Sequence, residues 1–312
     1  MSIYTGLSLP LPSELFEAEL EPNELLTREM PKHTVLFTTT MYQTNNGLWK
    51  PDILMRAQLA KRMFQKSRAW GYDIVCVDSD SEGGWLQCIK DLGVIVEPEK
   101  PDQYRGNHPQ GKSRRQSGDI AANLGTHETL TWLEPEKHPY IATDDYHYWS
   151  PAAMVAAPVY ERKVDAAIPR RIDLSHYPIT QQLNETYCNL TAMHMMRDAL
   201  RKRGVENPEE QVHYLDHCSG PRTIHRDYFD YFLRYPGEIN GKPHDQWESI
   251  IVPLWEMMLK GKRVGGVAVP YVHPAEQTAL ESKNAVYDMK RAIQANTLIS
   301  ALGEILGLTA AR

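Results

Sequence analysis

Two adjacent acids, Asp144 and Asp145, follow the apolar segment 139–143, which predicts a strand. Polar side chains at the carboxyl ends of strands are where α/β sheets place their ligands. Carboxylate oxygens are the ligands that Mg²⁺ and Mn²⁺ prefer. Asp144 and Asp145 are therefore candidate metal ligands, with His147 as an alternative, although an acid that follows a strand also commonly caps the next helix.

A second pair of acids, Asp78 and Asp80, comes directly after the apolar segment 72–77. A carboxylate at the end of a strand can accept hydrogen bonds from a ribose hydroxyl or a base N–H. We expect these two acids to bind substrate, with a solvated loop as the alternative.

Basic side chains gather at Lys112, Arg114 and Arg115, within a chain that is acidic as a whole. The planar guanidinium of arginine suits phosphate oxygens. We expect Lys112 and Arg115 to contact a phosphorylated substrate, unless this basic segment is only solvated.

The elements that must position these residues alternate between strands and helices. This alternation predicts a mostly parallel sheet that is wrapped by helices. Strands are predicted from hydrophobic patterning at 34–40, 72–77, 93–97, 139–143, 164–168 and 263–272, and helices at 52–70, 85–92, 186–203, 246–260 and from about residue 118. Residues 99–119 form a long polar stretch that we predict as a loop.

Composition limits the class of protein. The 312 residues are 42% hydrophobic and 24% charged, as in ordinary globular proteins. A net charge of −6 argues against a protein that coats duplex nucleic acid. No apolar run reaches the ~18 residues of a membrane span, and the first residues lack the layout of a signal peptide, so we predict a cytoplasmic protein without a span.

Five segments taken in order resemble GT-A-type nucleotide-sugar glycosyltransferases. They are VDSDSEGGWLQCIKDLGVIVEPEKP, GKSRRQSGDIAANLG, YIATDDYHYWSPAAM, CSGPRTIHRDYFDYF and HDQWESIIVPLWEMMLKGKRVGGVAVPYVHP. The segment DAAIPRRIDLSHYPITQQLNETYCN, with the Trp of DQWES, is similar to the retaining mannosylglycerate-synthase-like enzymes of that group. The order and spacing of the motifs carry the resemblance, which covers roughly residues 34–275.

The resemblance implies a GT-A-like, Rossmann-like α/β fold: a mixed, mostly parallel sheet flanked by helices. We expect an N-terminal arm at 1–32 and a catalytic domain at 33–275, with a nucleotide-sugar half at 33–151 and an acceptor half at 152–275. A C-terminal helix is expected within 276–312.

The resemblance also implies a metal site. In such enzymes a DxD-like motif follows a strand, and here Thr143-Asp144-Asp145 replaces a clean Asp-x-Asp. His273 stands where the family has a metal-binding histidine at the end of a later strand, and a surface turn is its alternative. A divalent cation, Mn²⁺ or Mg²⁺, would neutralise the diphosphate leaving group.

The remaining expected contacts lie mainly in the acceptor half. Asp245 and Glu248 are three residues apart at the start of the predicted helix 246–260, so they lie on one face of it. Either acid could act on the acceptor hydroxyl or on the transferred sugar. Acids are also favoured at a helix N-terminus for their charge alone. Further substrate contacts are expected at Thr38 in the first strand and at Ser219 and Gly220 in the small-residue loop. Arg170, Arg171 and Gln181 could bind a charged acceptor, with surface pairing as the alternative.

The leading hypothesis is a metal-dependent glycosyltransferase that moves a hexose from a GDP- or UDP-linked donor to a hydroxyl acceptor, possibly with retention. A sugar-phosphate nucleotidyltransferase is an alternative, although the Gly-rich loop expected after its first strand is replaced by Thr38-Thr39-Thr40-Met41-Tyr42. A non-catalytic nucleotide-sugar or carbohydrate-binding protein is another.

An apolar stripe near the C-terminus has two readings. Val286, Met289 and Ile293 have helical spacing, and so do the later Leu298 and Leu302. The stripe could pack into the core, or it could join two copies into a homo-oligomer through the C-terminal helix.

Overall fold

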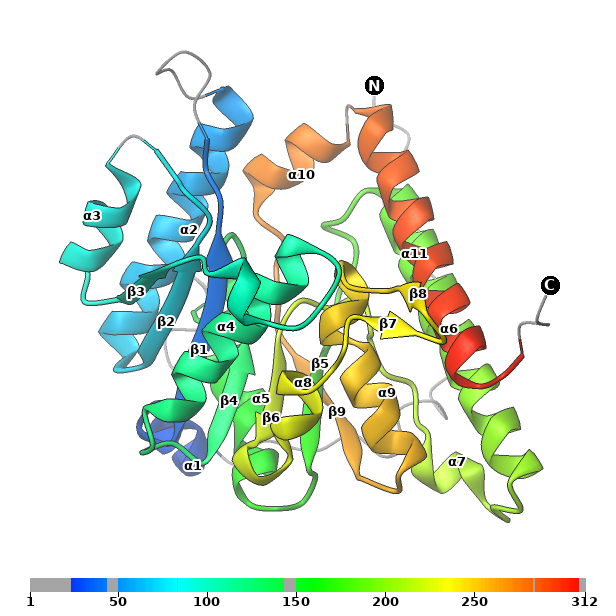
Figure 1. Ribbon diagram of the computed structural model, residues 1–312. Coiled ribbons are helices and arrows are strands. Elements are labelled where there is room, and N and C mark those ends of the chain that lie inside the picture. The colour runs from blue at the N-terminus through cyan, green and yellow to red at the C-terminus, as the bar shows by residue number, and fades with distance from the viewer. Residues whose placement is uncertain (1–23, 44–49, 83, 143–149, 283, 309–312) are drawn as a thin grey trace.

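The computed structural model describes residues 24–43, 50–82, 84–142, 150–282 and 284–308. Its centre is a seven-stranded sheet with the order β3-β2-β1-β4-β6-β5-β9, flanked by helices on both faces (Figure 1). Every neighbouring pair is parallel except those that involve β6, which runs antiparallel to β4 and β5. The predicted mixed, mostly parallel α/β fold is confirmed.

The first half of the chain follows the prediction closely. Each apolar, β-branched segment forms a strand, and each following segment forms a helix that crosses back over the sheet. The elements are β1 (Thr34–Thr40), α2 (Pro51–Trp70), β2 (Asp73–Asp78), α3 (Trp85–Asp91) and β3 (Ile95–Pro98). The described end of the predicted N-terminal arm is helical, with α1 (Glu24–Glu29) and η2 (Met30–Lys32).

The polar stretch 99–119 differs from the prediction. After the short turn η3 (Pro101–Gln103), helix α4 (Pro109–Asn123) begins nine residues earlier than expected. Pro109 occupies the first turn, and the His108 side chain accepts a hydrogen bond from Gln110 N at 3.2 Å. The polar sequence of this segment resembles a loop, but Arg114 and Arg115 are buried. Arg115 pairs with Asp245, and Arg114 donates to Gln246 O and Ser249 Oγ.

The strand predicted at 139–143 is also wrong in the part that the structure describes. Residues 138–140 form the 3-10 turn η4 (His138–Tyr140), and the sheet strand is β4 (Thr129–Trp132), ten residues earlier. β4 is only four residues long, and it lies within the region predicted as a helix from about residue 118. The chain therefore leaves the sheet at Leu133 and passes directly into Glu134-Pro135-Glu136.

The second half completes the same sheet. One strand, β6, escaped the prediction, and the helix predicted at 246–260 is split into a 3-10 segment and a shorter helix. The main elements are α5 (Pro151–Tyr160), β5 (Ala166–Arg171), α6 (Ile179–Lys202), β6 (Arg222–His225), η6 (Trp247–Ile250), α9 (Val252–Leu259) and β9 (Val264–Val269). The smaller ones are α7 (Pro208–Gln211), η5 (Arg226–Tyr228), α8 (Asp230–Leu233) and a hairpin of β7 (Glu238–Ile239) and β8 (Lys242–Pro243).

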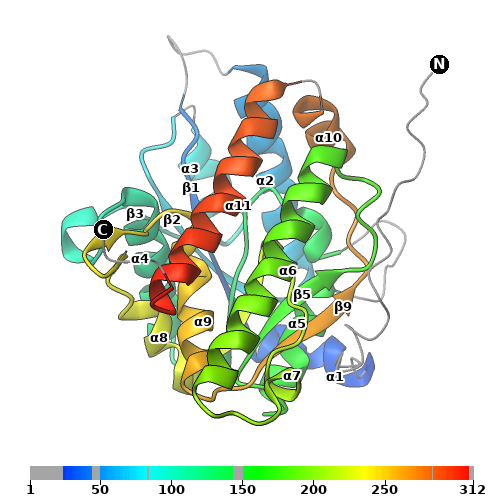
Figure 2. The same cartoon turned by 90° about the vertical axis from the view of Figure 1, so that its right-hand side faces the viewer.

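The C-terminal region contains two helices instead of one. α10 (Ala275–Glu281) is followed by the long α11 (Ala285–Ile305), which lies beside α6 (Figure 2). Among the described helices, none is both long enough and apolar enough to cross a bilayer.

Two apolar cores lie on opposite faces of the sheet, because successive strand side chains point to opposite sides. Val35 and Phe37 of β1 pack in the core formed with α4, α6, α8, α9 and α11. Leu36 belongs to the other core, which α2, α3 and α5 complete. The ring of Phe37 meets those of Phe229 and Phe232 edge-on, at 5.4 Å between ring centroids in each case.

Gly118 lets α4 approach this aromatic cluster. A Cβ atom at Gly118 would lie 2.8 Å from Phe232 Cε1 and 3.0 Å from Phe229 Cζ. We predict that Gly118→Ala lowers the free energy of unfolding by about 1–3 kcal/mol, because overpacking outweighs the better helix propensity of alanine. Urea unfolding measures this change, with Asn123→Ala at the exposed end of the same helix as control, expected within about 0.5 kcal/mol of the parent. A Gly118→Ala protein that is more stable than the parent would contradict this packing.

Candidate active site

Charged side chains from strands far apart in the sequence meet at one edge of the sheet. β4 and β5 end here, and β6, which runs the opposite way, begins here. Glu134 follows β4, Arg171 ends β5 and Arg222 begins β6. The antiparallel direction of β6 is therefore what brings Arg222 to the carboxyl edge of its neighbours.

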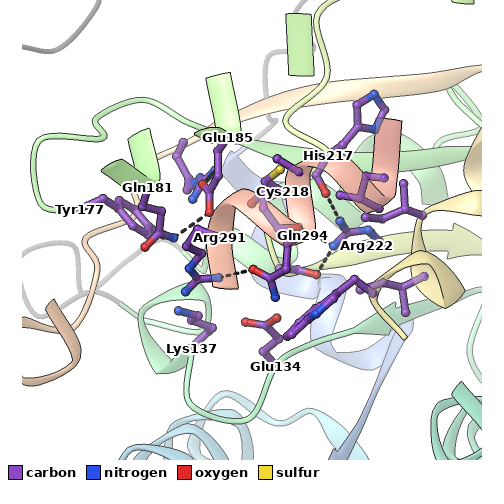
Figure 3. Close-up of a pocket in the computed structure, with 18 of the residues that line it drawn as sticks. Glu134, Lys137, Tyr177, Gln181, Glu185, His217, Cys218, Arg222, Arg291 and Gln294 are labelled. Carbon is purple, nitrogen blue, oxygen red and sulfur yellow. Dashed lines mark hydrogen bonds and ion pairs between the residues drawn. The ribbon is translucent and has the colours of Figure 1, made fainter. Parts of the chain in front are cut away.

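A cavity opens beside this edge and is closed on the other side by α6 and α11. It holds about 660 Å³ of empty space, part of it open to solvent. Figure 3 shows side chains from several separate segments converging on this space. The polar and charged residues that line it are Glu134, Lys137, Tyr140, Arg171, Tyr177, Gln181, Glu185, His217, Ser219, Arg222, Arg291 and Gln294, together with Cys218, Gly220 and Trp247.

Two of the cavity's arginines keep an unused N–H group. Arg222 donates from its terminal nitrogens to the carbonyls of His217, Ser219 and Gly220, and Arg291 donates to Glu281 and Gln294 at 3.2 Å each. Within the described part of the chain, the Nε atoms of Arg222 and Arg291 have no hydrogen-bond partner. A buried donor without a partner is unfavourable, so oxygen atoms of a ligand would satisfy both groups.

Arg171 differs from Arg222 and Arg291, because its guanidinium is already hydrogen-bonded to two protein carboxylates. Its Nε and Nη2 bind the two oxygens of Asp216 at 2.6 and 2.7 Å, and Nη2 also binds Glu185 Oε2 at 2.7 Å. All three side chains are buried, and the two acids raise the pKa of Arg171 despite the opposing effect of burial. Arg171 thus joins β5 to α6 and to the loop before β6, and it positions the cavity wall.

The electrostatic environment keeps Glu134 ionised. Burial alone would raise its pKa, but Lys137, Arg291, Arg114 and Arg222 together lower it below its usual value. Burial lowers the pKa of Arg222 to about 10 and, with the charge of Arg222 as the second cause, lowers that of His217 to about 3. His217 is therefore neutral near pH 7, and the cavity holds more positive than negative side chains.

His273 is the predicted metal ligand that lies among the described residues. His273 is buried and its pKa is strongly lowered, first by burial and then by Lys137, so its imidazole is neutral. However, Nε2 of His273 lies 3.0 Å from Lys137 Nζ and Nδ1 lies 2.7 Å from Thr278 Oγ1. Among the residues that the structure describes, no group of three or more His, Cys, Asp and Glu side chains could hold a metal ion.

The predicted ligands Asp144 and Asp145, and the alternative His147, lie outside the described residues. The chain that leads to them is described as far as Ala142, which lines a second cavity together with His273. The carbonyl of Ala142 accepts a hydrogen bond from Lys66 Nζ at 2.9 Å. Ala142 and His273 therefore share the wall of this second cavity.

With the sheet and the cavity described, the chain can be compared with known proteins. No protein-family model matches the sequence, and no curated protein matches it either. Mannosyl-3-phosphoglycerate synthase from Rubrobacter xylanophilus has a similar structure, with a TM-score of 0.58, 13% identity, and coverage of 96% of this chain and 85% of that one. This chain has a GT-A-type fold.

Glucosyl-3-phosphoglycerate synthase from Mycobacterium tuberculosis is a more distant likeness. Its solved structure aligns with a TM-score of 0.48 and 9% identity. The alignment covers 88% of this chain and 87% of the Mycobacterium chain. Other solved structures of the same protein contain UDP with Mn²⁺ or with Mg²⁺.

Three predicted substrate-binding residues of the GT-A-type chain line the cavity. Gln181 Nε2 donates to Glu185 at 2.7 Å, while Gln181 Oε1 has no partner among the described residues. Ser219 Oγ lies 2.5 Å from the hydroxyl of Tyr140, and Gly220 forms part of the wall next to Glu134. Arg170 is half-buried on β5 and does not line the cavity.

The predicted donor-side residues lie at the ends of β1 and β2. Asp78 is buried, and its carboxylate accepts hydrogen bonds from Thr40 Oγ1 at 2.5 Å and from Ser81 N and Oγ at 2.7 and 2.6 Å. Asp80 is exposed in a left-handed conformation. Thr38 is buried in β1, just past the point where the neighbouring strand β4 ends, and its Oγ1 has no partner among the described residues.

The predicted catalytic acid Asp245 has a different role. Its two oxygens accept hydrogen bonds from Arg115 Nη1 and Nη2 at 2.8 and 2.9 Å, and one also accepts from His108 N at 3.0 Å. A Cβ at Gly106 or Gly111 would lie about 2 Å from this carboxylate, so the two glycines leave the room for the pair. The pair is buried and outside the cavity wall, and therefore we propose no catalytic role for Asp245 and no phosphate contact for Arg115.

Glu248 and Lys112 also lie apart from the cavity wall. Glu248 is buried, lies 3.6 Å from His244 Nδ1 and accepts from Gln246 N at 3.1 Å, while His244 Nε2 lies 3.1 Å from Glu304 of α11. Glu248 is thus part of a contact that joins η6 to the end of α11. Lys112 is half-buried on α4.

Sequence reasoning missed five charged residues of the cavity: Glu134, Lys137, Glu185, Arg222 and Arg291. The signal for Glu134 and Lys137 was present in the sequence. Both follow closely after Thr129-Leu130-Thr131-Trp132, which has the β-branched and aromatic character of a strand. Arg222 and Arg291 carried no such signal, since only the fold brings β6 and α11 to this edge.

The buried pair of Arg115 and Asp245 gives a direct test of its structural role. We predict that Asp245→Asn lowers the free energy of unfolding by about 3–5 kcal/mol, because it leaves the Arg115 charge buried without a partner. Asp230→Asn is the matched control, since Asp230 pairs with Arg234 on an exposed surface and such pairs contribute about 0–1 kcal/mol. Chemical denaturation measures both. Equal stability of the two variants would show that the Asp245 carboxylate is free to serve a substrate.

Proposed function

We propose that this protein is a glycosyltransferase that moves a hexose from a nucleotide-sugar to a hydroxyl group of an anionic acceptor. The observation that carries the proposal is the cavity at the carboxyl edge of the GT-A-type sheet, whose lining residues Arg222 and Arg291 each keep a buried N–H group without a described partner. The name of the similar Rubrobacter enzyme supports a phosphorylated hydroxy acid as the first acceptor to test.

The donor would bind where β1 and β2 end. Ligands of open α/β sheets lie outside the carboxyl ends of the strands, and Asp78 and Asp80 are at this position. Because Thr40 and Ser81 already bond the Asp78 carboxylate, we propose that Asp78 shapes the turn and that the exposed Asp80 contacts the nucleoside. The choice between a GDP- and a UDP-linked donor is left to the binding test.

The acceptor would bind between the sheet edge and α11. Arg222 and Arg291 would hold its negative charge, and Gln181 Oε1 and Gln294 Nε2 are further polar atoms without a described partner. Glu134, ionised at the centre of the cations, would then lie beside the bound acceptor. A carboxylate in this position can orient a hydroxyl group or stabilise positive charge on the transferred sugar.

A divalent cation, as in the sequence-based prediction, would be held by Asp144 and Asp145, with His273 beside them. The shared cavity wall of Ala142 and His273 supports this grouping. His273 could contribute only after Lys137 moves away from its Nε2 atom. Such a cation supplies positive charge that offsets the charge developing on a diphosphate leaving group.

Donor binding tests the metal and the nucleotide together. We predict that UDP or GDP binds more tightly with Mn²⁺ or Mg²⁺ than in excess chelator, because the acids at 144 and 145 would otherwise repel the diphosphate. Isothermal titration calorimetry measures this gain, which Asp145→Ala removes along with transfer while the protein stays folded. Asp198→Ala, at an exposed position of α6, is the control. Equal affinity with and without metal would contradict metal dependence.

Acceptor kinetics test the role of the cavity. We predict that Arg291→Gln raises the KM for 3-phosphoglycerate by about 10- to 100-fold, because a hydrogen bond to a charged group contributes roughly 1.5–3 kcal/mol. The affinity for the nucleotide should change little, and Arg201→Gln on the exposed end of α6 should change neither. Nucleotide binding without transfer to any acceptor of a panel of phosphorylated and carboxylated hydroxy compounds would favour a non-catalytic binding protein.

A further inference from the structure

The outer surfaces of α6 and α11 carry two rows of large apolar side chains that remain exposed. On α6 the spacing is i, i+4, i+8, and on α11 it is i, i+3, i+7, so each row lies along one side of its helix. We call this surface the α6/α11 apolar face. Its residues, with 41–63% of each exposed, are Ile179, Leu183, Tyr187, Val286, Met289 and Ile293.

The two rows form one continuous surface because the helices lie side by side and run in the same direction. Thr180 Oγ1 donates to Asp288 near the start of both helices, and Cys188 Sγ lies 3.9 Å from the carbonyl of Ala295 further along. Figure 2 shows α6 and α11 next to each other on the face turned to the viewer. The C-terminal stripe therefore divides, with Leu298 and Leu302 in the core and the earlier residues outside.

This face lacks the charges that normally cover a helix exposed to water. Every exposed residue of α6 between positions 179 and 190 belongs to the apolar row. In the first half of α11 the exposed charged residue is Lys290, and its Nζ lies over the rings of Trp247 and Tyr287, at 5.4 and 5.9 Å from their centroids. The face is thus apolar across both helices.

Its size suits a protein interface. Six large side chains that are each about half exposed present a few hundred Å², similar to the ~300–600 Å² of the largest patch on a typical monomer, which is often functional. A standard interface covers about 800 Å² per partner and has an apolar centre with a polar rim. The α6/α11 apolar face is large enough to be that centre.

We propose that a second copy of this chain covers the α6/α11 apolar face and forms a two-fold symmetric dimer. In such a dimer the same surface serves both partners, so an uncharged apolar face needs no charge complement and is complementary to itself. A net charge of −6 makes most other approaches between copies repulsive, whereas this face contributes almost no charge. The contact brings together two pairs of helices, as in a four-helix bundle.

The dimer would also support the cavity, although the proposal does not rest on the proposed function. The inner sides of the same two helices carry Gln181, Glu185, Arg291 and Gln294. Burying the outer sides against a second copy would hold α6 and α11 against the sheet edge.

Sedimentation equilibrium of the full-length protein tests the dimer at about 1–100 µM, since standard interfaces give dissociation constants of µM or below. We expect the parent to be dimeric and Leu183→Glu and Met289→Glu to raise the dissociation constant at least ~100-fold, because symmetry buries two unpaired carboxylates per dimer. Leu54→Glu is the matched control, since Leu54 is 44% exposed on α2, outside the face, and this variant should stay dimeric. Circular dichroism verifies that all three variants fold.

Two results would overturn the proposal. If the parent is monomeric at every concentration, a second copy does not cover this face. If both variants on the face dimerise as the parent does, the dimer uses another surface.

Discussion

Charged side chains buried at the carboxyl edge of the sheet must be paired, and this requirement determines how the two halves of the chain pack together. Removing a charge from water costs several kcal/mol unless an opposite charge and hydrogen bonds replace the solvent. Arg171 finds Asp216 and Glu185, and Arg115 finds Asp245. The Arg115–Asp245 pair joins α4 to the segment before η6 across the two halves of the chain, and the Arg171 contacts join β5, α6 and the loop before β6 within the second half.

The same requirement is left incomplete at the cavity, and among the described arginines it is also incomplete at Arg114 and Arg226, which lie outside the cavity wall. Arg171 is fully paired, whereas Arg222 and Arg291 have buried Nε–H groups without a described partner. An unpaired donor alone therefore does not mark a ligand site. Arg222 and Arg291 differ from Arg114 and Arg226 because they also line the cavity, where a ligand could supply the missing acceptor.

The helices α6 and α11 both line the cavity and present an apolar outer surface. Their inner sides carry polar residues of the cavity, and their outer sides carry the α6/α11 apolar face. A helix repeats every 3.6 residues, so one segment can present polar groups to a ligand and apolar groups to a protein surface on opposite sides. In α11, Arg291 points to the cavity while Met289 and Ile293 are exposed.

The sequence by itself determined the elements with strong local patterns. β1 and β2, with α2 between them, were predictable because apolar, β-branched runs and helical spacing are local properties, and these features predicted the GT-A-type α/β class. The four-residue strands β4 and β6 were missed because such short segments are stabilised by their neighbours in the sheet more than by their own pattern. The resemblance to GT-A-type enzymes pointed to Ser219 and Gly220, and Gln181 was an expected acceptor contact; all three line the cavity. The sequence could not show that Arg115 is paired with Asp245 while Arg222 keeps a donor without a described partner. Only the tertiary structure decides this, because the partner of Arg115 lies 130 residues away in the chain.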